Sequence, residues 1–236
     1  MVQSRTIAAV LGGILSSAML SQAAPLVVRQ SGSTTCGGTG TTPPSNTSTS
    51  GYSGAPWSSG PYTGYPSGAA PVAQIFPDYT SQYNVKTGAV DFNTARGLVS
   101  RSYTNGGADM TTLVTFAVPQ QYAQNWCQVV FDLTDPSSSA TGSLKAQLFT
   151  SLAPATTDTT TWPSGNLRNQ NIGAIDVVPG GEAQWQVGSG PAATSDGFFP
   201  CSLIAGLVFG GEVVPQGDQV EISWPAGQDG VKIVVY

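Results

Sequence analysis

The chain has 236 residues, a formal net charge of −5 and charged side chains at only 9% of its positions. Nucleic-acid binding needs Lys and Arg clustered on one face, and eight scattered basic residues exclude it. Histidine is absent, so Ser-His-Asp and Cys-His catalysis in their usual forms and His-ligated zinc are excluded. No glycine-rich loop precedes a helical segment, so neither a phosphate cradle nor a cofactor is expected.

Residues 1–23 have the three parts of a secretory signal peptide. Arg5 supplies the positive start, Thr6 to Leu20 is an apolar run, and Ser21-Gln22-Ala23 places small residues before a cut after Ala23. The alternative is a membrane anchor, but about 15 apolar residues fall short of the roughly 20 that span a bilayer. We therefore expect a protein without a membrane span that is secreted, extracellular or held in the cell wall.

Residues 24–70 predict a disordered stalk. From residue 31 onward Ser, Thr, Gly and Pro dominate and no residue is charged, so little apolar surface offsets the entropy of ordering. This composition is typical of O-glycosylated stalks, and Asn46-Thr47-Ser48 makes Asn46 a predicted N-glycosylation site. Four aromatic residues recur in its second half, either as contacts for a partner or without a defined site: Tyr52, Trp57, Tyr62 and Tyr65.

Residues 71–236 predict one all-β domain. Apolar and polar residues alternate with a period of two, which is typical of strands with one face toward a core and the other toward water. The alternating segments are 127–133, 144–148, 182–187, 219–224 and 231–235, with further strand candidates at 97–104, 111–118, 172–178 and 207–214. One helical turn is expected near Gln120 to Gln124. Nine or ten short antiparallel strands, separated by turn signals such as Asn105-Gly106-Gly107, favour a single β-sandwich.

The chain has three cysteines. Cys36 lies in the stalk, whereas Cys127 and Cys201 lie in the domain. We predict a disulfide between Cys127 and Cys201, because exported proteins are oxidised and Cys127 has a core-facing position suited to a bridge between sheets. The alternative is two buried free thiols. Cys36 would then be free or linked to another molecule. A metal site is not expected, since no two cysteines are close in sequence and histidine is absent.

Carboxylate chemistry of the glycosidase kind is the catalytic option that remains without histidine. Glu182, Glu221 and Asp132 fall on predicted outward faces, and Glu212 lies in another strand. The simpler interpretation is that these are solvated carboxylates on the polar face of an acidic domain. We assign no catalytic residue.

Exposed aromatic rings are the usual contact surface of carbohydrate-binding sandwiches. Trp162 is the best candidate for a ligand-binding residue because its neighbours are polar turn formers; the alternative is a plug that covers the end of the sandwich. Trp126 has the same parity as Gln128 and is expected to point outward. Trp185 and Trp224 share parity with apolar neighbours and are expected in the core.

Several segments occur in an order that is typical of one family. They are Phe116-Ala117-Val118-Pro119 leading to Cys127 and Phe131, then Phe199-Pro200-Cys201, and finally Gly211 to Asp218 followed by Ile222-Ser223-Trp224. With them the domain resembles the But-two C-terminal domain (ubiquitin-three-binding-protein type) of secreted fungal proteins. Ser202-Leu203 depart from the pattern, since the family usually has Pro-x-Gly after this cysteine.

The resemblance implies a β-sandwich module without established catalytic residues. Through the family name it also implies an activating enzyme of a ubiquitin-like modifier as partner, which is cytosolic and conflicts with an export signal. We therefore expect a secreted or cell-wall-associated protein with a non-catalytic binding or structural domain, its partner a wall polysaccharide or a wall protein. The alternatives are a carbohydrate-active enzyme with paired carboxylates and a module that binds such an activating enzyme.

Overall fold

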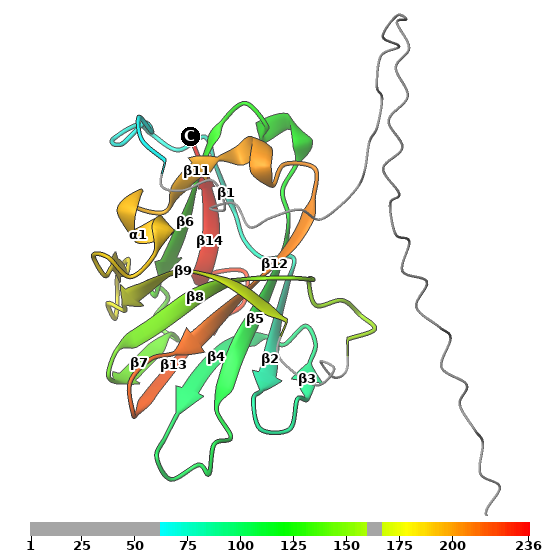
Figure 1. The fold of residues 1–236 in the computed structure, drawn as a ribbon, viewed down its shortest axis with the longest axis vertical. Coiled ribbons are helices and arrows are strands. Elements are labelled where there is room, and N and C mark those ends of the chain that lie inside the picture. The colour runs from blue at the N-terminus through cyan, green and yellow to red at the C-terminus, as the bar shows by residue number, and fades with distance from the viewer. Residues whose placement is uncertain (1–61, 160–166) are drawn as a thin grey trace, which may run out of the picture. The chain divides into compact units, whose positions relative to one another are not determined.

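The computed structural model describes residues 62–159 and 167–236, and strands dominate this part of the chain (Figure 1). Two antiparallel sheets make up a sandwich. The smaller sheet has four strands in the order β1-β14-β6-β11. These are β1 (Ala73–Ile75), β14 (Gly230–Val235), β6 (Trp126–Asp132) and β11 (Phe198–Pro200). The prediction of an all-β sandwich is confirmed.

The larger sheet has ten strands, with β10-β9-β8-β12-β5-β4-β13-β7 in order and β2 paired to both β5 and β3. The strands are β2 (Tyr79–Asn84), β3 (Val90–Asp91), β4 (Arg96–Arg101), β5 (Met110–Ala117), β7 (Ser139–Gly142), β8 (Lys145–Ser151), β9 (Arg168–Asp176), β10 (Gln184–Trp185), β12 (Val208–Pro215) and β13 (Val220–Pro225). The described residues thus contain more strands than the nine or ten expected. The strands without a predicted counterpart are β1, β2, β3, β7 and β11. Three of them, β1, β3 and β11, have only two or three residues, which are too few to show an alternating pattern.

Helical structure in the described residues is limited to three short pieces. They are the 3-10 turns η1 (Gln120–Tyr122) and η2 (Cys201–Leu203) and the helix α1 (Pro191–Thr194). η1 confirms the single helical turn expected near Gln120. Within residues 62–159 and 167–236, no helix has the length and apolar character needed to cross a membrane.

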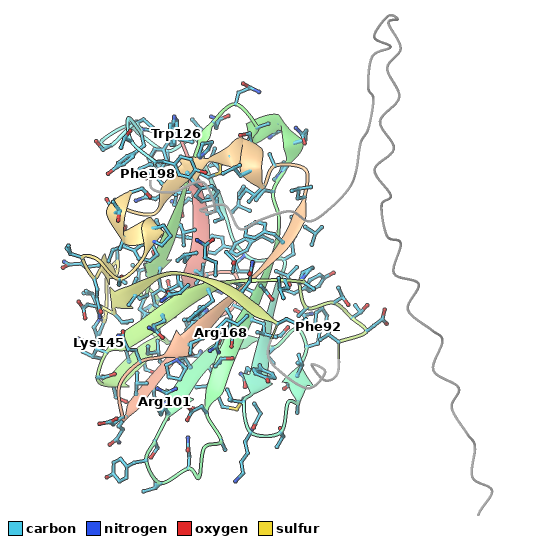
Figure 2. The ribbon with its side chains drawn as sticks, viewed as in Figure 1. Phe92, Arg101, Trp126, Lys145, Arg168 and Phe198 are labelled. Atoms are coloured by element: carbon cyan, nitrogen blue, oxygen red, sulfur yellow. A yellow bond between two sulfur atoms is a disulfide. The ribbon has the colours of Figure 1, made fainter. Side chains whose placement is uncertain are left out.

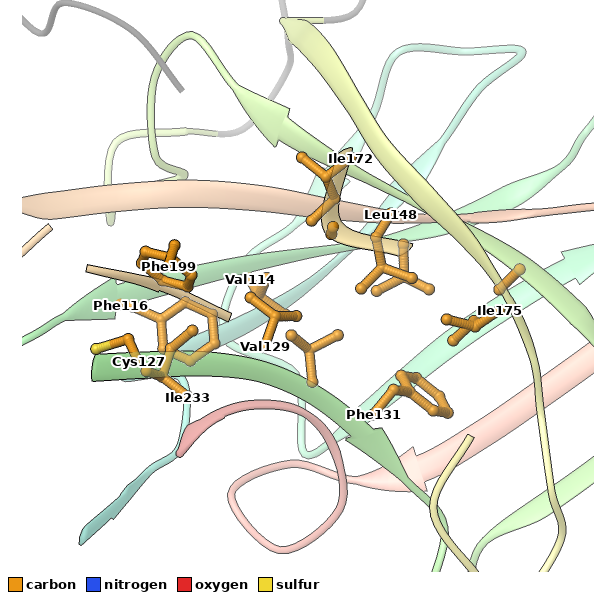
Figure 3. Packing of buried hydrophobic residues seen from close by; sticks show 14 of the residues in the cluster. Val114, Phe116, Cys127, Val129, Phe131, Leu148, Ile172, Ile175, Phe199 and Ile233 are labelled. Atoms are coloured by element: carbon orange, nitrogen blue, oxygen red, sulfur yellow. The ribbon is translucent and has the colours of Figure 1, made fainter. Parts of the chain in front are cut away.

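The main hydrophobic core lies between the two sheets (Figure 3). Side chains of β6 and β14, including Val129, Phe131 and Ile233, meet side chains of the larger sheet such as Phe116. The rings of Phe131 and Trp224 meet edge to face at a centroid distance of 5.2 Å. Burying each such side chain contributes roughly 1.5–3 kcal/mol relative to leaving it in water, so this layer supplies the main drive for folding.

Two glycines make room for the largest core side chain. Trp224 on β13 is only 1% exposed and lies directly opposite Gly97 of β4 in the register. A Cβ atom at Gly97 would lie 2.2 Å from the indole ring, and one at Gly230 would lie 2.1 Å from its Nε1. No real Cβ comes that close, so the indole fits only because both positions are glycine.

The alternation predicted along β13 is confirmed, because Val220, Ile222 and Trp224 are buried while Glu221 is exposed. Along β6 the predicted polar face is wrong, since Gln128, Val130 and Asp132 are all buried. Here both faces of the smaller sheet are closed to water. The sequence pattern alone does not show this, because the same polar residue type can be either exposed to water or buried with a hydrogen-bonding partner.

The strand predicted over residues 182–187 is also wrong in extent. Only Gln184–Trp185 pair as β10, with β9 as the partner. Val187, which was expected on the core side, is 99% exposed. Trp185 is half-buried and packs against the core, whereas Trp224 lies inside it as expected. The chain turns at Gly188, whose φ of 77° ends the extended run.

The corner between β4 and β5 depends on one threonine. These strands share a single backbone pair, Ser100 with Met110. The hydroxyl of Thr112 accepts a hydrogen bond from the N–H of Leu98 (2.8 Å) and donates one to its carbonyl (2.9 Å). A side chain therefore replaces part of the backbone ladder. This corner fixes the start of the loop that joins β4 to β5, residues 102–109.

Candidate functional site

Glu212, one of the four carboxylates considered for catalysis, lies inside the structure. Its side chain is fully buried and forms an ion pair with Arg168. Arg168 donates from Nε to Oε2 (2.9 Å) and from Nη2 to Oε1 (2.8 Å), and Thr111 donates to Oε1 (2.7 Å). Arg168 also lies over the ring of Phe149, 4.7 Å from its centroid. The arrangement links β5, β9 and β12 and serves the fold.

Asp132 is likewise not outward-facing, which corrects the prediction. Its carboxylate forms a buried ion pair with Lys232 of the neighbouring strand β14. Taking a carboxylate out of water is costly unless a partner compensates it, and Lys232 supplies that partner. The second carboxylate oxygen of Asp132 is buried and has no hydrogen-bond partner in the described part of the chain. Across an isolated β-bridge from Asp132 lies Glu182.

Glu182 keeps the exposure that the sequence predicted, but its environment is crowded with negative charge. Burial of part of the group raises the pKa of Glu182 above the usual 4.5, and the charges of Asp132 and Asp196 raise it further, while Lys232 opposes them. A group with a raised pKa in the folded state favours its protonated form there. Its contribution to stability is fully present below pH 4.5 and is lost as the pH rises through the raised pKa.

Replacing Glu182 with glutamine is therefore expected to remove a pH-dependent loss of stability. Relative to the wild type, Glu182→Gln should gain stability as the pH rises from about 4 to 7, because the amide stays neutral. The midpoint of urea unfolding, measured for both proteins at each pH, tests this. A constant difference between the two proteins over that range would contradict it. Asp229, whose pKa is lowered, changes stability with pH equally in both proteins, so its contribution cancels in the difference between them.

Asp229 shows the opposite behaviour for a clear reason. Burial alone would raise the pKa of Asp229, but hydrogen bonds to its carboxylate from the Ser138 hydroxyl, the Asp135 N–H and the Thr134 hydroxyl hold it below the usual 3.8. The carboxylate connects the turn after β13 to the segment before β7. Its contribution to stability is present above pH 3.8 and is lost as the pH falls through the lowered pKa.

Glu221 leads to a different kind of site, at the end of the sandwich that carries the β4–β5 loop. Exposed on β13, it pairs in register with Ser100 of β4 and Thr141 of β7. Side chains opposite one another on neighbouring strands have Cβ atoms about 4.5–5.5 Å apart. These three polar side chains therefore form a row across three strands, and the row borders a surface hollow.

The β4–β5 loop beside this row is rigidly built from its own polar groups. Arg101 donates from Nε to the Oδ2 of Asp109 (2.7 Å), and Asn105 donates from Nδ2 to Oδ1 of the same carboxylate (3.0 Å). Asn105 in turn accepts the N–H of Gly107 (2.8 Å). Gly106 and Gly107 have φ values of 63° and 82°, a left-handed backbone that favours glycine. The predicted turn at Asn105-Gly106-Gly107 is confirmed.

Tyr103 stands out from this loop with 79% of its surface exposed. Next to it lies a hollow of about 470 Å³ walled by polar and charged groups: Arg101, Ser102, Asn105, Asp109 and Asp218, with Gly107. Figure 2 shows Arg101 at the opposite end of the domain from Trp126 and Phe198. The sequence signalled the turn but not the site, because Asp218 comes from a turn more than a hundred residues further along the chain.

The aromatic residues weighed as ligand contacts have different positions. Trp162 lies outside the described residues. The predicted cleavage site at Ala23, the stalk cysteine Cys36 and the predicted glycosylation site Asn46 also lie outside them. Trp126 is half-buried at the start of β6, and Tyr62 meets its ring edge-on at 6.4 Å. Gln128 lies on the same face of β6 as Trp126 and is only 8% exposed. The prediction that this face is open to water is therefore wrong.

Two tyrosines of the predicted stalk contact the domain. Tyr65 stacks on Phe198 with ring centroids 4.4 Å apart, and Tyr62 packs against the hydrophobic core. Ordered contacts therefore begin upstream of the predicted domain boundary at Pro71. For these two residues, the structure favours contacts within the chain over contacts with a partner.

The predicted disulfide between Cys127 and Cys201 is confirmed, with both residues fully buried. It does not bridge the two sheets. Cys127 lies on β6, and Cys201 begins η2 directly after β11, which pairs with β6. The bond therefore stabilises the edge of the smaller sheet. Among residues 62–159 and 167–236, no three Asp, Glu, His or Cys side chains gather as a metal site.

Fold and site together define a β-sandwich domain with a surface hollow lined by polar groups at the end that carries the β4–β5 loop. The family model described as the ubiquitin 3 binding protein But2 C-terminal domain matches residues 93–210. The chain belongs to this family, which confirms the resemblance seen in its sequence. A comparison with curated proteins found no match.

The matched region contains the β4–β5 loop and both cysteines of the disulfide. It ends within β12, while the segment from Gly211 to Trp224 that also carried the resemblance lies beyond it. In the structure this segment continues β12 and forms β13. It completes the same sandwich and supplies Asp218 and Glu221 to the end of the domain that holds the loop.

Proposed function

We propose that this chain is a secreted, cell-wall-associated protein whose sandwich domain binds a polysaccharide and catalyses no reaction. The observation that carries the proposal is the exposed ring of Tyr103 (79%) beside a hollow with polar walls. Apolar ring surface that is covered by a sugar leaves water, which favours binding. The signal-like residues 1–23 and the stalk-like composition that follows support export.

The positions of the four carboxylates considered for catalysis support a binding role over a glycosidase that uses them. Glycoside hydrolysis needs two carboxyl groups that face each other across the scissile bond. Glu212 and Asp132 are committed to buried ion pairs, and Glu182 and Glu221 border different hollows. None of these four acids faces another of them across a shared hollow among the described residues.

Retention of the secreted full-length protein on insoluble β-glucan, chitin and cellulose tests the proposal. We expect at least one polymer to retain the wild type and Tyr103→Ala to be retained about tenfold more weakly, the equivalent of about 1.4 kcal/mol. Tyr103→Phe keeps the ring and should bind like the wild type. Val187→Ala removes an apolar side chain that is even more exposed and lies elsewhere, and it should leave retention unchanged.

Two results would overturn the proposal. The first is the absence of retention on every polymer. The second is retention that Tyr103→Ala leaves unchanged, since binding would then use another surface. Reducing-sugar release from any of the polymers would contradict the statement that the domain is not catalytic.

A second candidate function is a module that binds a protein, which the description of the family as a ubiquitin 3 binding protein favours. It needs a form of the chain that reaches the partner's compartment. Fractionation of cells that express the full chain separates the two candidates. Protein found only in the medium or the wall supports the first, whereas a stable pool inside the cell supports the second.

A further inference from the structure

A second hollow adjoins the one beside Tyr103, and the two share a wall. The second measures about 310 Å³, against about 470 Å³ for the first. Arg101, Ser102 and Asn105 border both. The end of β4 and the β4–β5 loop therefore border two neighbouring hollows at the same end of the sandwich.

The chemistry of the second hollow is that of short, mostly uncharged polar groups. The row of Ser100, Glu221 and Thr141 runs along it, and Gln219 adds an amide. Hydroxyl and amide groups both donate and accept hydrogen bonds, so they match the hydroxyl groups of a sugar. The first hollow adds an aromatic ring through Tyr103, which suits the apolar face of a sugar ring.

The charges of the two hollows select against anions. Their walls carry one cation, Arg101, and three anions, Asp109, Asp218 and Glu221. Arg101 is already neutralised by Asp109 at 2.7 Å. A uronate, sulfate or phosphate group would face the uncompensated carboxylates of Asp218 and Glu221, and like charges repel. A neutral glycan meets no such penalty.

Arg101, which borders both hollows, can donate hydrogen bonds to a ligand. Arg101 uses Nε for Asp109 and Nη1 for the carbonyl of Gly217 (3.4 Å). Its Nη2 donates to no residue within the described part of the chain, so its hydrogens are available to a sugar oxygen. Because Asp109 and Asn105 already hold the guanidinium and the loop in place, a ligand does not have to order them on binding.

From these observations we propose that the two hollows are consecutive subsites for a neutral glycan chain that crosses Arg101. One sugar unit covers the ring of Tyr103, and the next lies along the row of Ser100, Glu221 and Thr141. This inference rests on the proposed function and adds the class of polysaccharide, the minimum length and the direction in which the chain lies.

Titration calorimetry of the full-length protein with soluble β-linked glucose oligomers of one to six units tests the inference. Affinity should rise at least tenfold between one unit and two or three units and then level off. Tyr103→Ala should weaken binding at every length. Thr141→Val, which removes only a hydroxyl from an edge strand, should weaken the longer oligomers two- to fivefold and leave the single unit unchanged.

Oligogalacturonate of matched length serves as the anionic control and should bind at least tenfold more weakly than the neutral oligomers. Affinity that does not depend on length, a Thr141→Val effect that is absent or equal at every length, or preferred binding of the uronate would overturn the inference. These results leave the proposed function intact if polymer retention still depends on Tyr103. Loss of that dependence defeats the proposed function itself, so the two failures are distinguishable.

Discussion

Replacing both Cys127 and Cys201 with alanine is expected to lower the free energy of unfolding by about 4 kcal/mol. The disulfide joins residues 74 positions apart, and in the chain-entropy model a cross-link of that span stabilises a protein by about this amount. Single domains have total stabilities of roughly 5–15 kcal/mol. The variant should therefore unfold at a much lower urea concentration and approach the limit of stable folding.

The environment of the bridge supports an effect of this size. Both cysteines are fully buried, and β11, which precedes Cys201, is a three-residue edge strand that has β6 as its only partner among the described strands. Without the covalent link this edge depends on three register pairs. Urea unfolding monitored by tryptophan fluorescence, with the reduced wild type as control, measures the effect. An unchanged unfolding midpoint in the double variant would show that the native contacts alone hold β11 in place.

Sequence patterns predicted the fold class because one signal, period-two alternation, is produced by every strand with one dry face. Along β13 it also gave the correct faces. Along β6 it failed, since Asp132 and Gln128 are polar yet buried. Asp132 is compensated by Lys232, and Gln128 donates to the carbonyl of Asp196 (2.8 Å) and accepts from the Tyr236 hydroxyl (2.8 Å). Such partners come from segments far along the chain, so the local sequence pattern does not reveal them.

The candidate site was hidden for a related reason. The sequence around Tyr103 does not indicate that the turn containing Asp218 and the strand containing Glu221 lie at the same end of the sandwich. Only the register, in which β13 lies between β4 and β7, brings them together. Similarly, Gly97 and Gly230 are two among 29 glycines, and their role becomes visible only when Trp224 is placed between them.

Replacing Arg168 with methionine is expected to destabilise the protein by about 3–5 kcal/mol, because it leaves the charge of Glu212 buried without its cation. The Glu212 side chain is fully buried, while that of Arg168 keeps 28% exposure. Removing Arg168 therefore leaves the carboxylate of Glu212 without its cation in a place that water cannot reach. Thr111 still donates to Oε1, but a hydrogen bond to a charged group contributes about 1.5–3 kcal/mol, which is less than the loss of an ion pair that carries two such bonds.

The double variant Arg168→Met with Glu212→Met separates the charge from the packing. Replacing a buried ion pair by apolar side chains of similar volume is often neutral or even stabilising, and the Phe149 ring under Arg168 offers an apolar surface. We therefore expect the double variant to be more stable than Arg168→Met alone by at least 2 kcal/mol in urea unfolding. If it is instead less stable than either single variant, the pair stabilises the sheet through its bidentate geometry, and the desolvation argument for this site is wrong.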